Sequence, residues 1–385
     1  MPIFQILIAV FLSPQAWSYP EFIGYKYSSC LTCHFNGNGG GPLNDYGRAL
    51  WSAEIAGRLF SGNKTEDELG QSSGFLGSTE LPWWIRPGLK TRDLEYWANP
   101  GSSQRTSQNI LMQADANVAL FFDQDQRKAI VASYGYVPQP LRLSQPGSQK
   151  DKEWISREHY FRYQKSDSLW FYIGMLDKPY GIRIVDHTAY SRSKVGVAQN
   201  DQAHGIIAQY IQPKWEWSFD AFAGNLFQSA DLRQKGFSTL YEYEVVPNAR
   251  IGFSGIYSNN NYVGNQRLAI HSRSGLGYGS SILLEVGVIK NIPKAGGDIE
   301  QGYYSYAELQ QRLVRGYHLF VNGQSYKANM TADHDNLVQA GFGLLMFPMA
   351  RTEFRVEFAS GRQFNDDTDV QPESWTLLAQ VHLSL

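Results

Sequence analysis

The sequence predicts an all-β fold, a transmembrane antiparallel β-barrel of about 16 strands, preceded by a small α-helical segment. Three observations favour this fold. From residue 86 onward, apolar and polar residues alternate in segments of about ten residues, as in strands with one apolar and one wet face. The connections between these segments alternate between long and short. The 36 Gly, 23 Tyr, 21 Phe and 10 Trp are typical of tight turns and aromatic girdles.

The first residues are predicted to be a targeting segment. Residues 3–12 form an apolar run, and Ala16 and Ser18 are small residues at the two positions that a signal peptidase reads. The run is far shorter than the roughly 18 to 20 residues of a membrane helix. Residues 1–18 are therefore predicted to be a signal peptide that directs the chain out of the cytoplasm.

The next segment carries a cofactor motif. Residues 30–34 read Cys-Leu-Thr-Cys-His, which is the pattern required for covalent attachment of a c-type haem. Cys30 and Cys33 would each form a thioether with a haem vinyl group, and His34 would be the proximal iron ligand. The chain has only these two cysteines, so one covalent haem c would leave none for a disulfide. Residues 19–85 are predicted to be the haem-binding segment.

Three other interpretations of the motif are a redox-active cysteine pair, half of a zinc site and two unmodified thiols. A redox pair of the thioredoxin type normally lies in a βαβ unit, and zinc needs two further ligands near by. Residues 21–85 contain no further Cys or His. Haem attachment is therefore the preferred interpretation.

A helix is expected after the motif, because apolar residues recur there at near-helical spacing. Asn44 or Asp45 would cap it. Its apolar face would cover the haem, or it would be an ordinary amphipathic helix docked on the rim of the barrel. The residues of that face are Leu43, Tyr46, Leu50, Trp51, Ile55 and Leu59.

A sixth iron ligand would have to come from elsewhere, since the haem segment holds no Met and no second His. His271, His318 and His382 lie in the inward phase of their strands, toward the expected periplasmic ends. Met349 lies in a short turn, and signal cleavage would free the amino group of Tyr19. Polarity of the barrel interior explains each histidine equally well, and a five-coordinate iron is the remaining alternative.

Residues 86–385 are predicted to form the barrel. Residues 352–358, Thr-Glu-Phe-Arg-Val-Glu-Phe, alternate without a break. An even number of strands leaves both ends of the barrel on the periplasmic side, so the haem segment is expected there. A soluble β fold is the alternative. Strands are expected near residues 86–98, 107–122, 127–137, 153–165, 168–177, 205–212, 215–224, 236–246, 249–258, 266–274, 281–290, 302–311, 316–325, 336–347, 351–361 and 372–384.

The chain resembles bacterial outer-membrane proteins that carry an N-terminal single-haem c-type cytochrome segment fused to a porin-like β-barrel. The residues that carry the resemblance are 19–22, Tyr-Pro-Glu-Phe, 26–34, ending in the cysteine motif, and 42–50, Pro-Leu-Asn-Asp-Tyr-Gly-Arg-Ala-Leu. The resemblance implies a bacterial outer-membrane location with the haem segment on the periplasmic side. It also implies outer-membrane lipid as a partner, together with a periplasmic electron-transfer protein or a redox-active solute, and a homotrimer.

In porins of this size the third long loop commonly folds into the barrel and narrows it. Here that connection spans residues 178–204 and is the longest. Its mixed charges could select solutes by sign and size, whereas a solvated surface loop is the plainer interpretation. The expected pore-constriction residues are Arg183, Asp186, His187 and Arg192.

Two functions are consistent with this sequence. The preferred one is a haem-binding outer-membrane cytochrome that takes part in electron transfer at the periplasmic face. The alternative is a porin-like diffusion channel whose haem segment acts as a plug, gate or redox sensor. The net charge of −2 argues against a nucleic-acid partner. No serine-hydrolase elbow, zinc-protease helix or Walker loop is found in the sequence, so an enzyme is not expected.

Overall fold

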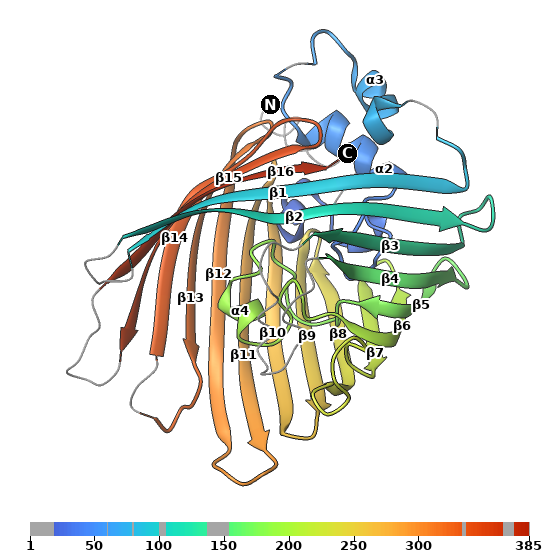
Figure 1. The fold of residues 1–385 in the computed structure, drawn as a ribbon. Helices are drawn as coiled ribbons and strands as arrows, with labels where there is room; N and C mark the ends of the chain where they lie inside the picture. Colours follow the sequence, from blue (N-terminus) through green and yellow to red (C-terminus); the bar gives the residue numbers. More distant parts are fainter. Residues whose placement is uncertain are drawn as a thin grey trace, which may run out of the picture.

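The structure is a computed structural model that describes residues 19–59, 61–78, 81–99, 105–136, 154–332, 336–364 and 373–384. The predicted signal peptide, residues 1–18, lies outside these residues. Within the described residues, 16 antiparallel strands form one closed barrel in which β1 pairs with β16 (Figure 1). No helix among these residues is long and apolar enough to cross a membrane.

The predicted strands are confirmed, most of them to within a few residues. Their bounds are β1 (Ile85–Asn99), β2 (Thr106–Phe121), β3 (Lys128–Tyr136), β4 (Trp154–Gln164), β5 (Leu169–Leu176), β6 (Ala203–Ile211), β7 (Trp215–Phe222), β8 (Lys235–Val246), β9 (Ala249–Asn259), β10 (Val263–Gly277), β11 (Ser280–Pro293), β12 (Glu300–Val314), β13 (Tyr317–Lys327), β14 (Asn336–Met349), β15 (Thr352–Phe364) and β16 (Ser374–Ser384).

The barrel is apolar outside and polar inside, the reverse of a soluble protein. In β15, Val356 and Phe358 are exposed on the outer face, whereas Glu353, Arg355 and Glu357 are buried inside. The alternation follows from the pleat of a strand, which points successive side chains to opposite faces. The inward face therefore has to be satisfied by ion pairs, such as Arg355 with Glu357 at 2.8 Å.

One end of the barrel has short turns and the other has long connections. We call them the turn end and the loop end. The first residue of β1 and the last residues of β16 both lie at the turn end, as an even strand number requires. The wall is uneven in height, because β10 to β12 have 14 or 15 residues each and β5 and β7 have only 8 (Figure 1).

Residues 19–78, here called the inner segment, occupy the turn end of the barrel (Figure 1). Its short helices are η1 (Pro20–Tyr25), η2 (Cys30–Thr32), α2 (Asp45–Leu50), η3 (Trp51–Ile55), α3 (Glu66–Gln71) and η4 (Phe75–Gly77). The helix expected from the apolar spacing is therefore shorter than predicted. It ends near Ile55, and Leu59 is 60% exposed and Tyr46 48% exposed, so neither belongs to a buried face.

Two apolar clusters join the inner segment to the barrel wall. In the first, Phe22, Cys33 and Trp51 pack with Phe320 and Phe347 of β13 and β14. In the second, Phe35 packs with side chains of β2 to β6, including Phe121 at a ring-centroid distance of 5.5 Å. These clusters form the apolar contact surface of the inner segment.

The connection between β5 and β6, residues 177–202, folds into the barrel as expected and contains the short helix α4 (Tyr190–Ser193). Three of its backbone N–H groups donate to wall side chains. Gly181 donates to Ser254 at 3.0 Å, Ile182 to Glu285 at 2.5 Å and Tyr190 to Gln324 at 2.7 Å. These acceptors lie on β9, β11 and β13, so this inner loop crosses the lumen.

Candidate functional site: a cavity between the inner segment and the inner loop

The cysteine motif forms one turn of helix. The backbone N–H groups of Cys33 and His34 both donate to the carbonyl of Cys30, at 3.2 and 3.0 Å. Residues three and four apart on such a turn lie on one side of it. The turn therefore brings Cys30, Cys33 and His34 close together along the backbone.

The chain returns from the motif through a glycine-rich loop. Gly39, Gly40 and Gly41 have φ angles of 80°, 72° and 64°, a left-handed run that residues with a side chain rarely adopt. A Cβ on Gly39 would lie 3.2 Å from the sulfur of Cys30. The glycines therefore allow bare backbone to pass beside this thiol.

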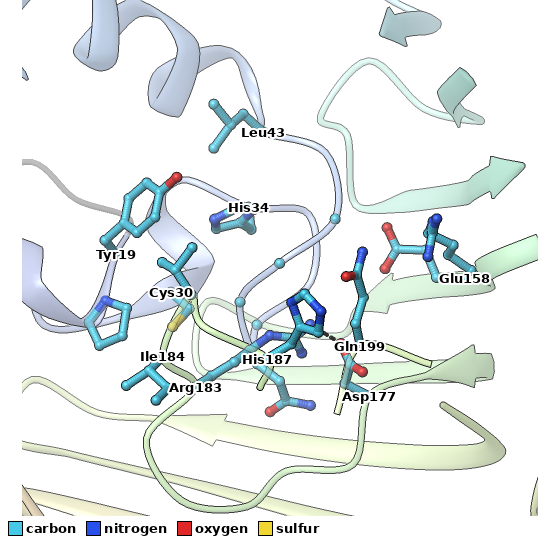
Figure 2. A pocket seen from close by; sticks show the side chains of 18 of the residues that line it. Tyr19, Cys30, His34, Leu43, Glu158, Asp177, Arg183, Ile184, His187 and Gln199 are labelled. Atoms are coloured by element: carbon cyan, nitrogen blue, oxygen red, sulfur yellow. Dashed lines mark ion pairs between the residues drawn. The ribbon is translucent and has the colours of Figure 1, made fainter. Parts of the chain in front are cut away.

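A cavity of about 220 Å³ lies between the motif and the inner loop (Figure 2). Cys30 and His34 line it from the inner segment, and Arg183 and His187 line it from the inner loop (Figure 2). Its wall is mixed in character. Apolar lining residues are Leu43, Trp51, Ile182, Ile184 and Leu240, and charged ones are Lys90, Arg92, Asp115, Arg157, Glu158, Asp177, Arg183, Arg192, Glu216, Glu242 and Arg273.

The two cysteines have different surroundings. Cys30 lines the cavity, and burial raises the pKa of its thiol to about 11. Cys33 is fully buried in the apolar cluster with Phe22 and Trp51, and it is not a lining residue of the cavity. The sequence treats the two thiols alike, whereas the fold presents only Cys30 to the open space.

These residues fit a covalent haem in their donor set and their backbone. The turn brings Cys30 and His34 to the cavity, part of the cavity wall is apolar, and Lys90 and Arg183 bring positive charge that suits carboxylate groups. For the second thioether, a haem edge would have to reach Cys33 within its cluster. Cys30, Cys33 and His34 are the residues that would hold the group.

The candidate sixth ligands separate into two groups. Tyr19 and His382 line the cavity together with His34, whereas His271, His318 and Met349 do not. His271 lies 2.9 Å from Glu242, and it is near the middle of β10 rather than toward the turn end as predicted.

The other two residues outside the cavity lie at the turn end. His318 lies 2.8 Å from the hydroxyl of Tyr25, and Met349 is the last residue of β14. All three histidines face the barrel interior and are buried, as their strand phase predicts.

The four expected constriction residues lie on the inner loop, within the lumen. Arg183 and His187 line the cavity, and Arg183 forms an ion pair with Asp177 (Figure 2). Burial lowers the pKa of His187 to about 4, so its ring is neutral at physiological pH. Both face open space where a solute or cofactor could meet them.

The remaining two constriction residues hold the inner loop in shape. Asp186 accepts hydrogen bonds from the backbone and hydroxyl of Thr188 at 2.8 and 2.6 Å. Arg192 donates to the carbonyls of Ile184 and Val197. Arg192 also lines the cavity, so it both holds the loop and faces the open space.

Sequence reasoning missed the wall residues that contact the motif. Ser29 donates to Glu216 at 3.0 Å, and Arg273 donates to the carbonyl of Ser28 at 2.9 Å and pairs with Glu242. Their only sequence signal is a charge in the inward phase of a strand. That signal marks the lumen face but does not reveal which charges lie next to the motif.

A closed barrel of sixteen antiparallel strands with a long loop folded inside is the architecture of outer-membrane porins. No protein-family model matches the chain, and no curated protein matches its sequence.

Solved structures do match the fold. In-vitro folded OmpT, an outer membrane protein of Vibrio cholerae, has a TM-score of 0.60 at 9% identity, covering 80% of this chain and 99% of that one. Pseudomonas putida OprB has a TM-score of 0.59 at 8% identity, covering 79% and 94%. The outer membrane channel DcaP of Acinetobacter baumannii has a TM-score of 0.55 at 7% identity, covering 78% and 97%. Identities this low show a shared fold alone.

Proposed function

We propose that this protein is a porin-type channel of the bacterial outer membrane whose own inner segment closes the lumen from the periplasmic side and carries one covalent haem c. The observation that carries the proposal is that the inner segment occupies the turn end of the barrel and packs against β2 to β6, β10, β11, β13 and β14. The channel would then conduct when the inner segment moves, so this segment is a plug and a gate rather than a separate domain.

The outer surface of the barrel supports the membrane location. Large apolar side chains such as Leu268, Ile270 and Val286 project outward from the strands and are exposed. Burial of apolar surface contributes about 25 cal/mol per Å², so a bilayer stabilises this surface and water does not. Outer-membrane barrels keep their short turns in the periplasm, and this supports a periplasmic position for the turn end and the inner segment.

Besides the apolar clusters, wall side chains hold the gate by donating to backbone carbonyls of the inner segment. Gln209 donates to Gly37 at 3.2 Å, and Arg315 donates to Ala56 at 2.8 Å. Further donors are Lys90 to Gly41, Arg273 to Ser28 and Arg351 to Gly74. A hydrogen bond from a charged donor contributes about 1.5 to 3 kcal/mol. Several such bonds together favour one docked position of the inner segment.

The motif makes this gate a candidate redox sensor. A bound haem c supplies a one-electron couple between ferrous and ferric iron. Cys30 and Cys33 would hold its ring and His34 its iron, while Lys90 and Arg183 balance its carboxylates. Because these residues belong to the inner segment, the inner loop and the wall, a change of charge in the cavity acts on all three.

Single-channel conductance tests the gate. The full chain is expected to conduct poorly in planar bilayers, and deletion of residues 24–78 is expected to raise conductance to a porin-like level. Gly24→Val is a milder test, since a Cβ at Gly24 would lie 2.3 Å from the carbonyl of Ser280 and would push η1 off the wall. Gly70→Ala is the matched control, because its Cβ meets only ordinary contacts near 3.7 Å. Free conductance by the full chain would overturn the proposal.

Electron transfer is the second candidate function. It is favoured by the position of Cys30 and His34 on a cavity inside the lumen, where the barrel wall separates them from lipid. The partners would be a periplasmic electron-transfer protein and a redox-active solute. Protein in sealed vesicles is expected to accept electrons from a reduced soluble cytochrome c without solute flux. Equal solute flux through the wild type and a Cys30→Ala, Cys33→Ala variant would instead favour the channel alone.

We further propose a homotrimer. The V. cholerae OmpT protein has a solved trimer form with a TM-score of 0.58 at 8% identity. In this chain the low wall of β4 to β7 carries exposed aromatic residues, including Trp154, Phe161 and Trp217, which a neighbouring protomer could cover. The mass of the detergent-extracted protein, measured by light scattering, tests this assembly.

A further inference from the structure

A buried carboxylate joins the start of the inner segment to the last strand. The hydroxyl of Tyr19 donates to Glu353 at 2.6 Å, and the Nδ1 atom of His382 lies 3.3 Å from the same carboxylate oxygen. Gln380 donates to the other oxygen at 3.4 Å. Glu353 is fully buried, so this carboxylate fixes both the tyrosine and the imidazole.

His382 is a buried histidine that, within the described part of the chain, is bonded through one ring nitrogen only. Its side chain is 7% exposed, and its Nε2 atom is buried without a hydrogen-bond partner among the described residues. Histidines that bind metals usually donate their other ring N–H to a carboxylate, which fixes the tautomer and leaves a lone pair for the metal. An Nδ1–H bonded to Glu353 leaves that lone pair on Nε2. A buried polar atom without a partner costs about 1 to 3 kcal/mol, which a ligand would relieve.

The position of His382 separates it from the other histidines of the wall. His382 lines the same cavity as Cys30 and His34, whereas His271 and His318 do not. The Nε2 atoms of those two already face Glu242 and Tyr25. His187 also lines the cavity, but it lies on the inner loop and no carboxylate hydrogen bond orients its ring in the described residues.

We propose that His382, held by Glu353, is a second protein ligand of the haem iron, here called the distal ligand, in addition to His34. This inference rests on the haem of the proposed function. Ligation by His34 and His382 would join the inner segment to β16 through the iron, and the Tyr19 to Glu353 hydrogen bond would join the same two parts a second time. Loss of the distal ligand would therefore loosen the gate as well as change the iron.

Spectra of purified full-length protein, produced with haem-maturation machinery, test the assignment. The wild type is expected to show a six-coordinate low-spin ferric iron by electron paramagnetic resonance and no binding of carbon monoxide when reduced. His382→Ala is expected to become high-spin, to bind carbon monoxide, and to return to low spin with added imidazole. His382→Met keeps a ligating side chain and is expected to give a methionine–iron charge-transfer band, which would support the position even if the Ala variant folds poorly.

His271→Ala, at a position outside the cavity, is the matched control and is expected to keep the wild-type spectrum. His187→Ala tests the competing histidine of the cavity and is expected to stay low-spin. A His382→Ala protein that stays low-spin and does not bind carbon monoxide overturns the assignment, as does a high-spin His187→Ala protein. The alkaline pyridine spectrum of denatured protein measures covalent haem independently. If the wild type carries none, the haem of the proposed function fails and this inference fails with it; if it carries haem with unchanged ligation in the variants, only the inference fails.

Discussion

At the scale of single residues, Asn44 organises the cysteine motif. Its side-chain oxygen accepts the N–H of Gly47 at 2.8 Å and caps α2, as the sequence predicts for Asn44 or Asp45. Its amide donates to the carbonyl of Thr32 at 2.8 Å and to that of Leu31 at 3.3 Å. The neighbouring Asp45 instead pairs with Arg86 of β1 at 2.7 Å. One side chain therefore fixes the start of α2 and the turn of the cysteine motif together.

Asn44→Ala is expected to destabilise this part of the inner segment by about 1 to 2 kcal/mol, the usual effect of losing a cap. Asn44→Asp keeps the accepting oxygen and loses the amide donors, so it should protect α2 while loosening the turn of residues 30–34. Hydrogen exchange of peptides from the two regions measures the difference. Equal exchange in the wild type and both variants would show that Asn44 holds neither.

At the scale of elements, η1 is the wedge of the inner segment that packs against β10 and β11 of the wall. The N–H of Gly279 donates to the carbonyl of Gly24 at 2.9 Å in the turn between β10 and β11. Glu21 of the same helix is 2% exposed and faces Glu308 of β12. Burial, and then the charge of Glu308, raise the pKa of Glu21 to about 8 from an ordinary value of 4.5. The docked wedge therefore favours a neutral Glu21.

Docking of the inner segment is expected to weaken with rising pH. Because the pKa of Glu21 is higher when docked, its contribution is fully present below about pH 4.5 and is lost as the pH rises through about 8. Each unit of pKa difference corresponds to about 1.4 kcal/mol. Glu21→Gln should make docking independent of pH in this window, and Asp67→Asn, at an exposed position, should not. Proteolysis of residues 19–78 between pH 5 and pH 9 measures docking; a pH response that survives in Glu21→Gln would assign it to another group.

At the scale of the whole molecule, the outward face decides whether the barrel inserts into lipid. Ile270 lies at the middle of β10 and is 60% exposed on that face. Ile270→Arg is expected to destabilise the protein in phosphatidylcholine vesicles, lowering its free energy of unfolding by about 2 to 4 kcal/mol, because an arginine at the bilayer midplane is not solvated there. Ile270→Val keeps an apolar side chain and is the control. Guanidinium titration in vesicles measures both, and equal stabilities would place this strand outside the hydrocarbon.

The barrel can be predicted from the sequence alone, because residues two apart in a strand lie on the same face. Alternation in residues 352–358 was enough to predict β15, and the long and short connections gave the sense of each strand. The cysteine motif and the capping asparagine were equally local. Every one of these predictions depended on neighbours along the chain.

The contents of the lumen and the groups that share the cavity depend on contacts between residues far apart in the sequence, which only the tertiary structure shows. His271, His318 and His382 have the same inward phase, so no local pattern could select the one that lines the cavity with His34. The contact between Tyr19 and Glu353 joins residues 334 positions apart. Such pairs are set by barrel closure and by the packing of the inner segment, whereas periodicity records only which face a side chain is on.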